Sequence, residues 1–192
     1  MPLIIPEYRD AAKRRIIEAG FFVMNEKGYC AMTMNDIAAR LGVSKGTLYN
    51  YFETKDDLVI EIIKTIHEDV VKTAKEAFPE SSPHKIWTLL TDRYMTKESS
   101  NNSLYIEATA MATRKKIIRE SLSKNMMIWI DIATQNIIDQ QNRGLIRPEL
   151  DARTLAIEIV SIFLGFQNLA VAGIDQKEIR DHWMAMLNGL FP

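Results

Sequence analysis

The sequence contains a single cysteine, Cys30, among its 192 residues. One thiol cannot close an internal disulfide, and this fits a reducing compartment. We expect Cys30 to be a small buried apolar residue, because no second cysteine is present to resolve an oxidised one. No apolar run approaches the roughly 18 residues of a membrane span, and the first residues lack the basic region of a signal peptide. These absences predict a cytoplasmic protein without a membrane partner.

Patterns that indicate catalysis are also missing. The three histidines, His67, His84 and His182, are far apart and show neither His-x-x-x-His nor Glu-x-x-His spacing, so no metal site is expected. No glycine-rich phosphate loop and no nucleophile elbow occurs. We therefore expect no catalytic site, no metal and no cofactor.

An excess of charge of one sign is lacking as well. The chain has 24 Lys and Arg against 25 Asp and Glu, a formal net charge of -1. Residues 1–60 are balanced too, with eight Lys or Arg (Arg9, Lys13, Arg14, Arg15, Lys27, Arg40, Lys45, Lys55) and eight Asp or Glu (Glu7, Asp10, Glu18, Glu26, Asp36, Glu53, Asp56, Asp57). Bulk charge thus argues mildly against DNA binding, and only a local arrangement can argue for it. With 47% apolar residues the chain can bury a real core.

Residues 33–52 have the pattern of two short helices joined by a tight turn. Thr33 is placed to cap the first helix, and Asp36 approximates its partner in a capping box. Gly42 is the expected stop, because a residue without Cβ adopts the left-handed conformation that ends a helix. Ser44 then provides the cap of the second helix.

The second helix has an apolar side and a polar side. Leu48 and Phe52 are expected to face the first helix. The residues left facing outward are Lys45, Gly46, Thr47, Tyr49, Asn50 and Tyr51. A glycine in the first turn allows close backbone approach, and the others supply donors and apolar edges for phosphates and bases in a major groove. Any helical hairpin with a polar face is the alternative interpretation.

The combination of residues resembles the DNA-binding signature of the TetR family of transcriptional regulators. The matching residues are Thr33, Ile37, Ala38, Gly42, Val43, Ser44, Gly46, Leu48, Tyr49, Tyr51 and Phe52, followed by Lys55 and Leu58. The resemblance implies phosphate contacts from Thr33, Ser44, Tyr51 and Lys55. It places Lys45, Thr47, Tyr49 and Asn50 near base edges, with Gly46 between them.

The remaining pattern predicts an all-α fold of two domains. A first helix from Pro6 to about Gly28 packs behind the hairpin, so that residues 1–53 form a three-helix DNA-binding domain. A helix over 54–78, capped by Thr54, leads into a ligand-binding and dimerisation domain, 54–192. Within it we expect helices over 84–97 and 104–112, separated by the polar run 98–103. A long helix over 118–137 closes at Gly144, and Asp151 caps the next helix.

The last two predicted helices are the most apolar of the chain. Their apolar residues are Leu155, Ile159, Ile162, Phe163, Phe166 and Leu169, then Ile179, Trp183, Met186, Leu187 and Leu190. Ile157, Val160 and Leu164 add apolar surface on further faces, more than one intramolecular contact needs. In the resembled family two such helices from each subunit form a four-helix dimer interface, so a homodimer through these helices is implied. Simple core packing is the alternative.

The C-terminal domain contains residues suited to a cavity for apolar molecules. Flexible thioethers and aromatic rings come from several predicted helices: Trp87, Met95, Met111, Met126, Trp129, Phe163 and Phe166. Glu107 and Gln167 are polar residues among apolar neighbours that could orient a ligand. For each of these residues an ordinary place in the core is the alternative.

The resemblance therefore implies a ligand-responsive transcriptional repressor. As a homodimer it would bind a pseudo-palindromic operator in double-stranded DNA, and a small apolar or amphipathic effector would release it. The alternative is a helical small-molecule or protein-binding module that does not use DNA.

Overall fold

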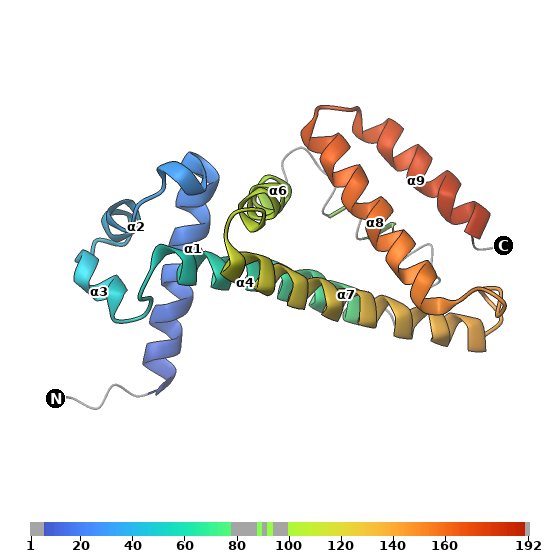
Figure 1. Ribbon diagram of the computed structural model, residues 1–192, viewed down its shortest axis with the longest axis horizontal. Helices are drawn as coiled ribbons and strands as arrows, with labels where there is room; N and C mark the ends of the chain where they lie inside the picture. Colours follow the sequence, from blue (N-terminus) through green and yellow to red (C-terminus); the bar gives the residue numbers. More distant parts are fainter. Residues whose placement is uncertain (1–5, 78–87, 90–91, 94–99, 191–192) are drawn as a thin grey trace.

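The computed structural model describes residues 6–77, 88–89, 92–93 and 100–190 (Figure 1). Every regular element within these residues is a helix, which confirms the all-α fold. The helices are α1 (Pro6–Ala31), α2 (Met34–Leu41), α3 (Lys45–Tyr49), α4 (Lys55–Ala77), α6 (Ser100–Ala112), α7 (Lys116–Asn142), α8 (Ala152–Val171) and α9 (Gln176–Leu190). The helix expected over 84–97 falls almost entirely outside the described residues.

The helices form two groups that α4 connects (Figure 1). The helices α1, α2 and α3 gather at one end of the molecule, while α8 and α9 lie at the other end. Between these ends α4 and α7 lie against each other, and α6 contacts α1, α4, α7 and α8. The long helix that begins beside α3 therefore enters the second group without a break, as its apolar stripe predicted.

The first helix has the expected end and a close contact with α4. Gly28, at φ 71°, interrupts the helical backbone, so the predicted end is confirmed and only a short turn follows to Ala31. Near the middle of α1, a Cβ on Gly20 would lie 3.0 Å from Ile62 Cδ1 and 3.1 Å from Leu58 Cδ2. The missing side chain thus lets α1 lie directly on α4.

Reciprocal hydrogen bonds fix the start of α4. Thr54 N donates to Asp57 Oδ2 at 2.9 Å, and Asp57 N donates to Thr54 Oγ1 at 3.1 Å. This capping box confirms the predicted cap and satisfies two backbone donors that the helix itself leaves free. Leu58 and Ile62 of the expected stripe are buried. The junction between α3 and α4 is therefore defined by local sequence.

The turns around α7 also follow the sequence. Gly144, at φ 72°, follows the end of the 27-residue helix, and Asp151 Oδ1 accepts from Thr154 N at 2.7 Å to cap α8. At 1.5 Å per residue α7 is about 40 Å long, which spans most of the second group. The antiparallel pair α7 and α8 is thus set by a glycine stop and an aspartate cap.

Two apolar cores stabilise the fold, and the first crosses the expected domain boundary. Its buried residues include Ile16, Val23, Met24, Ile37, Leu48, Phe52, Leu58, Ile62, Leu104, Ala108, Ile118 and Leu122. The second contains Trp129, Ala133, Ile137, Leu155, Ile159, Phe163, Trp183 and Leu187. The helix α6 and the start of α7 belong to the first core. A movement of these helices would therefore displace side chains against which the helix-turn-helix packs.

Two expectations were wrong in detail. The helix α6 begins at Ser100, inside the run 98–103 that was assigned to a polar connection. Serine and asparagine favour caps and turns in isolation, but the contacts of α6 with α1 and α7 override that weak preference. Cys30 is exposed rather than buried, because it lies in the turn after Gly28, between Tyr29 and Ala31.

The expectation that no segment is apolar enough to span a membrane was wrong for α8. Among the described helices it is the one whose length and composition would suffice to cross a membrane. It contains two charged residues, Arg153 and Glu158, and so it did not appear as an uninterrupted run. In the fold Leu155, Ile159 and Phe163 are buried in the second core, as expected of a core helix.

Candidate nucleic-acid interface and inner cavity

The helix α2 is held by a complete capping box. Thr33 N donates to Asp36 Oδ2 at 2.9 Å, and Asp36 N donates to Thr33 Oγ1 at 3.2 Å. The hydrogen bonds from Lys27 and Thr33 lower the pKa of Asp36 to about 2. The cap is thus ionised at neutral pH, where its charge favours the N-terminus of the helix. Asp36 fills the place of the usual Glu or Gln.

The turn between the two helices is also as predicted. Gly42 has φ 68° and its N–H closes the end of α2. Ser44 Oγ then accepts from Thr47 N at 3.1 Å and lies 2.9 Å from Thr47 Oγ1, which caps α3. Leu48 and Phe52 are buried against α1 and α2. The regular part of α3 ends at Tyr49, so the predicted helix over 44–52 is one turn shorter than expected.

The outward side of α3 carries the residues that the resemblance assigns to bases. Lys45, Gly46, Tyr49 and Asn50 are exposed, while Thr47 is half-buried. Lys45 Nζ lies 5.5 Å from the centroid of the Tyr49 ring, so the two side chains form one donor-bearing and apolar surface. Tyr51, assigned to a phosphate, is half-buried in the following turn, and Val43 adds an exposed apolar side chain before Ser44.

Gly46 is not required by the fold of this chain. Its φ is not in the left-handed region, and a Cβ added there would meet only Ser44 Oγ, at 3.7 Å. An alanine would therefore fit and would favour the helix. The absence of a side chain makes physical sense if something outside this chain approaches the backbone here.

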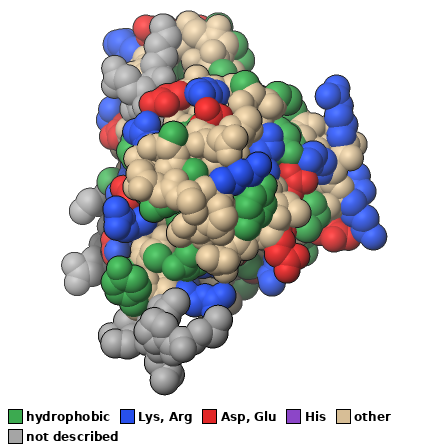
Figure 2. All heavy atoms as spheres, turned by 90° about the vertical axis from the view of Figure 1, so that its left-hand side faces the viewer, with side chains coloured by type: hydrophobic (Ala, Val, Ile, Leu, Met, Phe, Trp, Pro, Cys, Tyr) green, Lys and Arg blue, Asp and Glu red, His purple; other side chains and the backbone are tan. Residues whose placement is uncertain are grey.

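The charges at this end of the molecule are interspersed rather than segregated, as Figure 2 shows. Internal ion pairs hold three of the cations: Lys13 with Glu61, Lys27 with Asp36 and Arg40 with Glu26. Five of the eight cations of residues 1–60 have no ion pair to any described residue: Arg9, Arg14, Arg15, Lys45 and Lys55, of which Lys55 donates to backbone carbonyls instead. The net charge of residues 1–60 is zero, but some of their cations have no internal ion pair and can contact phosphates.

Arg15 belongs to that subset and was missed by the sequence analysis. It lines a small hollow between α1 and α3 together with Val43, Thr47 and Tyr51. Arg15 is thus beside the proposed DNA surface, whereas the sequence analysis counted it only among the cations of residues 1–60. The packing of α1 against α3 was the missing information.

Lys55 is engaged within the protein. Its Nζ donates to Tyr29 O at 2.8 Å and to Met32 O at 3.0 Å, and it lies 4.0 Å from the centroid of the Tyr29 ring. An ammonium group has three protons, so two of them are used here. The structure adds a role that the resemblance did not imply, since Lys55 ties the start of α4 to the turn before α2.

Tyr29 is the centre of a polar junction between the two helix groups. Its hydroxyl donates to Asp56 Oδ1 at 2.5 Å and accepts from Lys115 Nζ at 2.5 Å. Its backbone N–H donates to Glu107 Oε1 at 2.6 Å. Lys115 Nζ also lies 2.6 Å from Asp56 Oδ2. We call Tyr29, Lys55, Asp56, Glu107 and Lys115 the Tyr29 junction. It joins α1, α4, α6 and the residue that precedes α7.

Burial and mutual contacts shift the pKa values within this junction. Burial, reinforced by the hydrogen bond to Asp56, raises the pKa of Tyr29. Burial alone would raise the pKa of Asp56, but hydrogen bonds from Lys115 and Tyr29 outweigh it and lower that pKa. The same bonds to Asp56 and Tyr29 raise the pKa of Lys115. At neutral pH the junction is therefore a neutral tyrosine between an ammonium and a carboxylate.

A small inner cavity of about 30 Å³ lies among α4, α6, α7 and α8. Its walls are Ile66, His67, Val70, Tyr105, Trp129, Leu164 and Gln167. We call it the inner cavity. Its two polar walls, His67 and Gln167, are each 8% exposed, and the atoms His67 Nε2 and Gln167 Oε1 have no hydrogen-bond partner among the described residues. Buried polar atoms are usually hydrogen-bonded, so these two atoms call for an explanation.

The sequence analysis identified part of this cavity. Trp129 and Gln167 line it as expected, and His67 and Tyr105 were missed because spacing does not show which face of a helix meets which neighbour. Met111 packs against the first core, and Met126 receives a weak contact from Tyr105 Oη, 3.9 Å from its sulfur.

Other predicted ligand residues lie elsewhere. Phe163 and Phe166 pack edge-to-face on Trp183 of α9, with centroids 6.0 Å and 5.8 Å away, so they belong to the second core. Glu107 serves the Tyr29 junction. Trp87 and Met95 lie outside the described residues. Core packing, the alternative given for each residue, thus describes Phe163 and Phe166.

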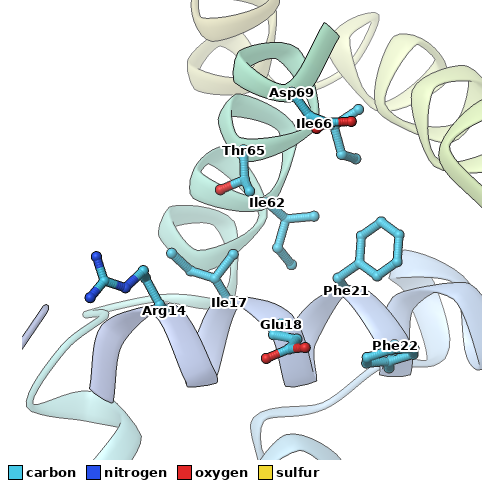
Figure 3. Close-up of a pocket in the computed structure, with 9 residues that line it drawn as sticks. All are labelled: Arg14, Ile17, Glu18, Phe21, Phe22, Ile62, Thr65, Ile66 and Asp69. Atoms are coloured by element: carbon cyan, nitrogen blue, oxygen red, sulfur yellow. The ribbon is translucent and has the colours of Figure 1, made fainter. Parts of the chain in front are cut away.

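Two outer grooves flank α4. One, of about 630 Å³, lies between α4 and α7 and shares His67 with the inner cavity; we call it the outer groove. The other, of about 430 Å³, lies between α1 and α4 (Figure 3). Figure 3 shows Phe21 and Ile62 near its middle, with Arg14 at one end and Asp69 at the other. None of the buried unpartnered atoms of the described residues lines this second groove.

The helix α8 retains apolar side chains on its surface. Ile157 is 43% exposed, Ile162 38% and Leu169 44%, while the opposite side of the helix is in the core. Ile162 and Leu169, seven residues apart, lie on one side of the helix, and Ile157 lies about 140° around it from Ile162. This exposure agrees with the surplus apolar surface that the sequence predicted.

Comparison with known proteins identifies the helix-turn-helix. A family model described as bacterial regulatory proteins, tetR family, matches residues 16–62, which span α1 to the first part of α4. The chain is 22% identical over 160 residues to the HTH-type transcriptional repressor DhaR of Mycobacterium sp. (strain GP1), covering 82% of this chain and 81% of that protein. It is 22% identical over 141 residues to the fatty acid metabolism regulator protein of Bacillus subtilis, covering 72% and 73%.

Solved structures share the whole fold. A transcriptional regulator from Saccharomonospora viridis, crystallised in complex with choline, superimposes with a TM-score of 0.83 at 20% identity, covering 95% of this chain and 99% of that one. GusR of Salmonella enterica gives 0.83 at 20% identity, covering 97% of both chains. The described residues contain no cluster of three metal-binding side chains. With its signature residues on α2 and α3 and this match over residues 16–62, the chain belongs to the TetR family of helix-turn-helix transcriptional regulators.

Proposed function

We propose that the protein is a ligand-responsive repressor that binds a pseudo-palindromic operator as a homodimer. A small, largely apolar effector bound in the C-terminal domain releases it from DNA. The observation that carries the proposal is the surface of α3, where Lys45, Gly46 and Tyr49 face outward from a helix anchored by the buried Leu48. Gly46 leaves the backbone open to a neighbour that the chain itself does not supply.

Two copies of α3 would enter successive major grooves, about one helical turn or roughly 35 Å apart. The proposed base-edge contacts are Lys45, Thr47, Tyr49 and Asn50, and the proposed phosphate contacts are Thr33, Ser44, Tyr51 and Lys55. Arg15, free of ion pairs with described residues and beside α3, is added to the phosphate contacts. Lys55 has one proton left for a phosphate while it holds its two carbonyls.

The homodimer is proposed to form through α8 and α9 of each subunit. The exposed Ile157, Ile162 and Leu169 support this, because a two-fold interface would remove them from water. The same symmetry supplies the pair of recognition helices that a pseudo-palindrome requires. In this proposal, binding to the operator therefore requires the dimer.

The effector is proposed to act through the inner cavity. A molecule larger than about 30 Å³ must push its walls apart, and these walls belong to α4, α6, α7 and α8. The Tyr29 junction connects α4, α6 and the start of α7 to the turn before α2, so a shift of these helices reaches the DNA surface. A useful effector needs to bind the DNA-incompetent state better by about 1 to 3 kcal/mol.

A similar protein supports a small-molecule effector. The Saccharomonospora viridis regulator, which shares this fold, holds choline in its crystal structure. That neighbour does not identify the effector of this chain, because fold similarity at 20% identity does not transfer a binding site.

The experiment that tests the proposal measures binding of the purified protein to the DNA immediately upstream of its own gene. Unrelated DNA of equal length is the control, and several salt concentrations are used. Tight, sequence-selective binding that weakens with salt supports the regulator. Equal, weak binding to both DNAs would instead support a helical binding module that does not use DNA, which the balanced charge of residues 1–60 favours.

A further inference from the structure

Two hydrogen-bond acceptors that have no partner among the described residues, His67 Nε2 and Gln167 Oε1, belong to residues that line the inner cavity. Gln167 Oε1 is an acceptor by its chemistry. His67 is an acceptor because burial lowers its pKa to about 4, so the ring is neutral near pH 7. Its hydrogen bond to the backbone of Ile63 uses the other ring nitrogen, since Nε2 has no partner. That bond leaves the lone pair of Nε2 free.

The rest of the cavity wall is apolar or already engaged. Trp129 packs edge-to-face on the His67 ring at 6.1 Å, and the Tyr105 ring lies 6.5 Å from it. The Tyr105 hydroxyl faces the sulfur of Met126. No acidic or basic side chain other than the neutral His67 lines the cavity. Nothing in these walls would therefore neutralise a carboxylate.

We propose that the effector is a compact apolar molecule carrying a hydrogen-bond donor, as a hydroxyl or an ammonium group, which it places between His67 Nε2 and Gln167 Oε1. This inference rests on the proposed function, which states that an effector binds in the C-terminal domain, and it adds the chemical class of that effector. A carboxylate is disfavoured at this position, because no Lys or Arg lines the inner cavity to neutralise it. A hydroxyl donates one proton to this pair of acceptors, whereas an ammonium group has protons for both.

The room for the apolar body comes from the outer groove. The inner cavity alone holds about one or two waters at 30 Å³. His67 lines both spaces, and the outer groove adds apolar walls from Ile60, Ile117 and Ile128. A donor group that reaches His67 can thus leave its body between α4 and α7. Binding of this kind would spread α4 from α7, and Lys115, the residue before α7, contacts Asp56 of α4 in the Tyr29 junction.

The test uses four molecules of similar size: benzyl alcohol, benzylamine, toluene and benzoate. The readout is the imidazole nitrogen NMR signal of His67 in protein labelled with ¹⁵N-histidine. The chain has three histidines, and the variant His67→Gln assigns the signal. Benzyl alcohol and the benzylammonium ion are expected to shift the Nε2 signal and to bind about tenfold more tightly than toluene, with benzoate weakest.

A matched pair of variants separates recognition from packing. Gln167→Met keeps the volume and removes one acceptor, so the preference for benzyl alcohol over toluene should shrink severalfold while toluene still binds. Gln135→Met makes the same change at an exposed site on α7 and should leave the preference unchanged.

Several outcomes would overturn the inference. Benzoate or toluene binding as well as benzyl alcohol would do so, as would a His67 signal that none of the four molecules moves, which would mean that the cavity holds water alone. Operator binding is measured on the same samples. If the four molecules bind in the predicted order but do not release DNA, the proposed function is contradicted and the assignment of the donor stands. If they release DNA but do not bind in that order, the assignment of the donor is contradicted and the proposed function stands.

Discussion

The two helix groups differ in how completely they satisfy their own polar atoms. In the helix-turn-helix, Thr33 with Asp36, Ser44 with Thr47 and Thr54 with Asp57 pair over three residues. The buried side-chain atoms without partners lie in the later part of the described chain, at His67, Asn125, Gln140 and Gln167. The short-range pairs thus complete the caps around the helix-turn-helix, whereas two of the four residues with unpartnered atoms, His67 and Gln167, line the inner cavity.

The apolar surface shows the same contrast. The apolar residues Leu48 and Phe52 are buried, and the outer side of α3 is mainly polar. The helix α8, in contrast, has a buried apolar side and also exposed apolar side chains. The first region presents a finished surface. The second is incomplete as a single chain, in its interior and at its surface, and this is the arrangement expected of a domain that must dimerise and respond.

A charge on the exposed side of α8 should give the largest effect. Ile162→Glu is expected to convert a dimer to a monomer, because the interface cannot pair a buried carboxylate. Operator affinity should then fall by roughly 100-fold or more, since the two recognition helices lose their linkage. Analytical ultracentrifugation and operator titration measure both. Met127→Glu, at a side chain 46% exposed on α7, is the control. If Ile162→Glu remains a dimer, the exposed apolar side of α8 is not the dimer interface, and the surface contrast between the two regions no longer holds.

Truncation of Tyr49 tests the finished surface. Tyr49→Ala should weaken operator binding by about 10- to 100-fold, the cost of one good base contact, while binding to unrelated DNA changes little. The melting temperature should stay unchanged because the side chain is 43% exposed. Tyr49→Phe keeps the ring and separates apolar contact from the hydroxyl. Equal loss on both DNAs would place Tyr49 on a phosphate instead.

Removal of Lys115 tests the junction between the regions and should cost about 1 kcal/mol, since the ammonium is partly exposed. The sign follows from the pKa shifts. The lowered pKa of Asp56 gives stability that is present above its ordinary value of 3.8 and lost as pH falls through the folded value. The raised pKa values of Tyr29 and Lys115 give stability that is present below about 10 and lost at higher pH.

The free energy of unfolding of Lys115→Met, measured by urea titration, should therefore differ most from that of the unchanged protein near neutral pH. The difference should shrink as the pH falls below 3.8, the ordinary pKa of Asp56, and as it rises above 10.5, the ordinary pKa of Lys115. Lys177→Met removes an exposed ion pair with Asp181 on α9 and should change little at any pH. A difference that is constant with pH would show that Lys115 acts by packing alone.

The same contrast explains what the sequence allowed us to predict. Caps and stops depend on residues three or four apart, so Thr33, Gly42, Ser44, Thr54 and Asp151 could all be placed correctly. The family model covers residues 16–62, which contain all of these residues except Asp151. Fold class and recognition helix were within reach because their determinants are local.

The cavity and the junction depend on contacts between distant residues. Lys115 meets Tyr29 across 86 positions, and Glu107 meets it across 78, so no spacing indicates either contact. His67 carries no pattern of its own and becomes a candidate only when α6, α7 and α8 enclose it. Trp129 was selected as an aromatic ring and Gln167 as a polar residue among apolar neighbours, and the first criterion also selected Phe163, which belongs to the core.

The smallest expected effect has a sign that decides the role of Gly46. Gly46→Ala should raise the free energy of unfolding by about 0.5 kcal/mol, because alanine favours the helix and its Cβ has room. Operator affinity should nevertheless fall severalfold, because the new methyl group meets the DNA backbone. Gly42→Ala, at φ 68°, should instead lose about 1 kcal/mol of stability to strain. Thermal unfolding and operator titration on both variants separate the two causes. A Gly46→Ala protein that is more stable and binds the operator fully would mean that this backbone is not approached by DNA, and the contact surface would then have to begin at Thr47 and Tyr49.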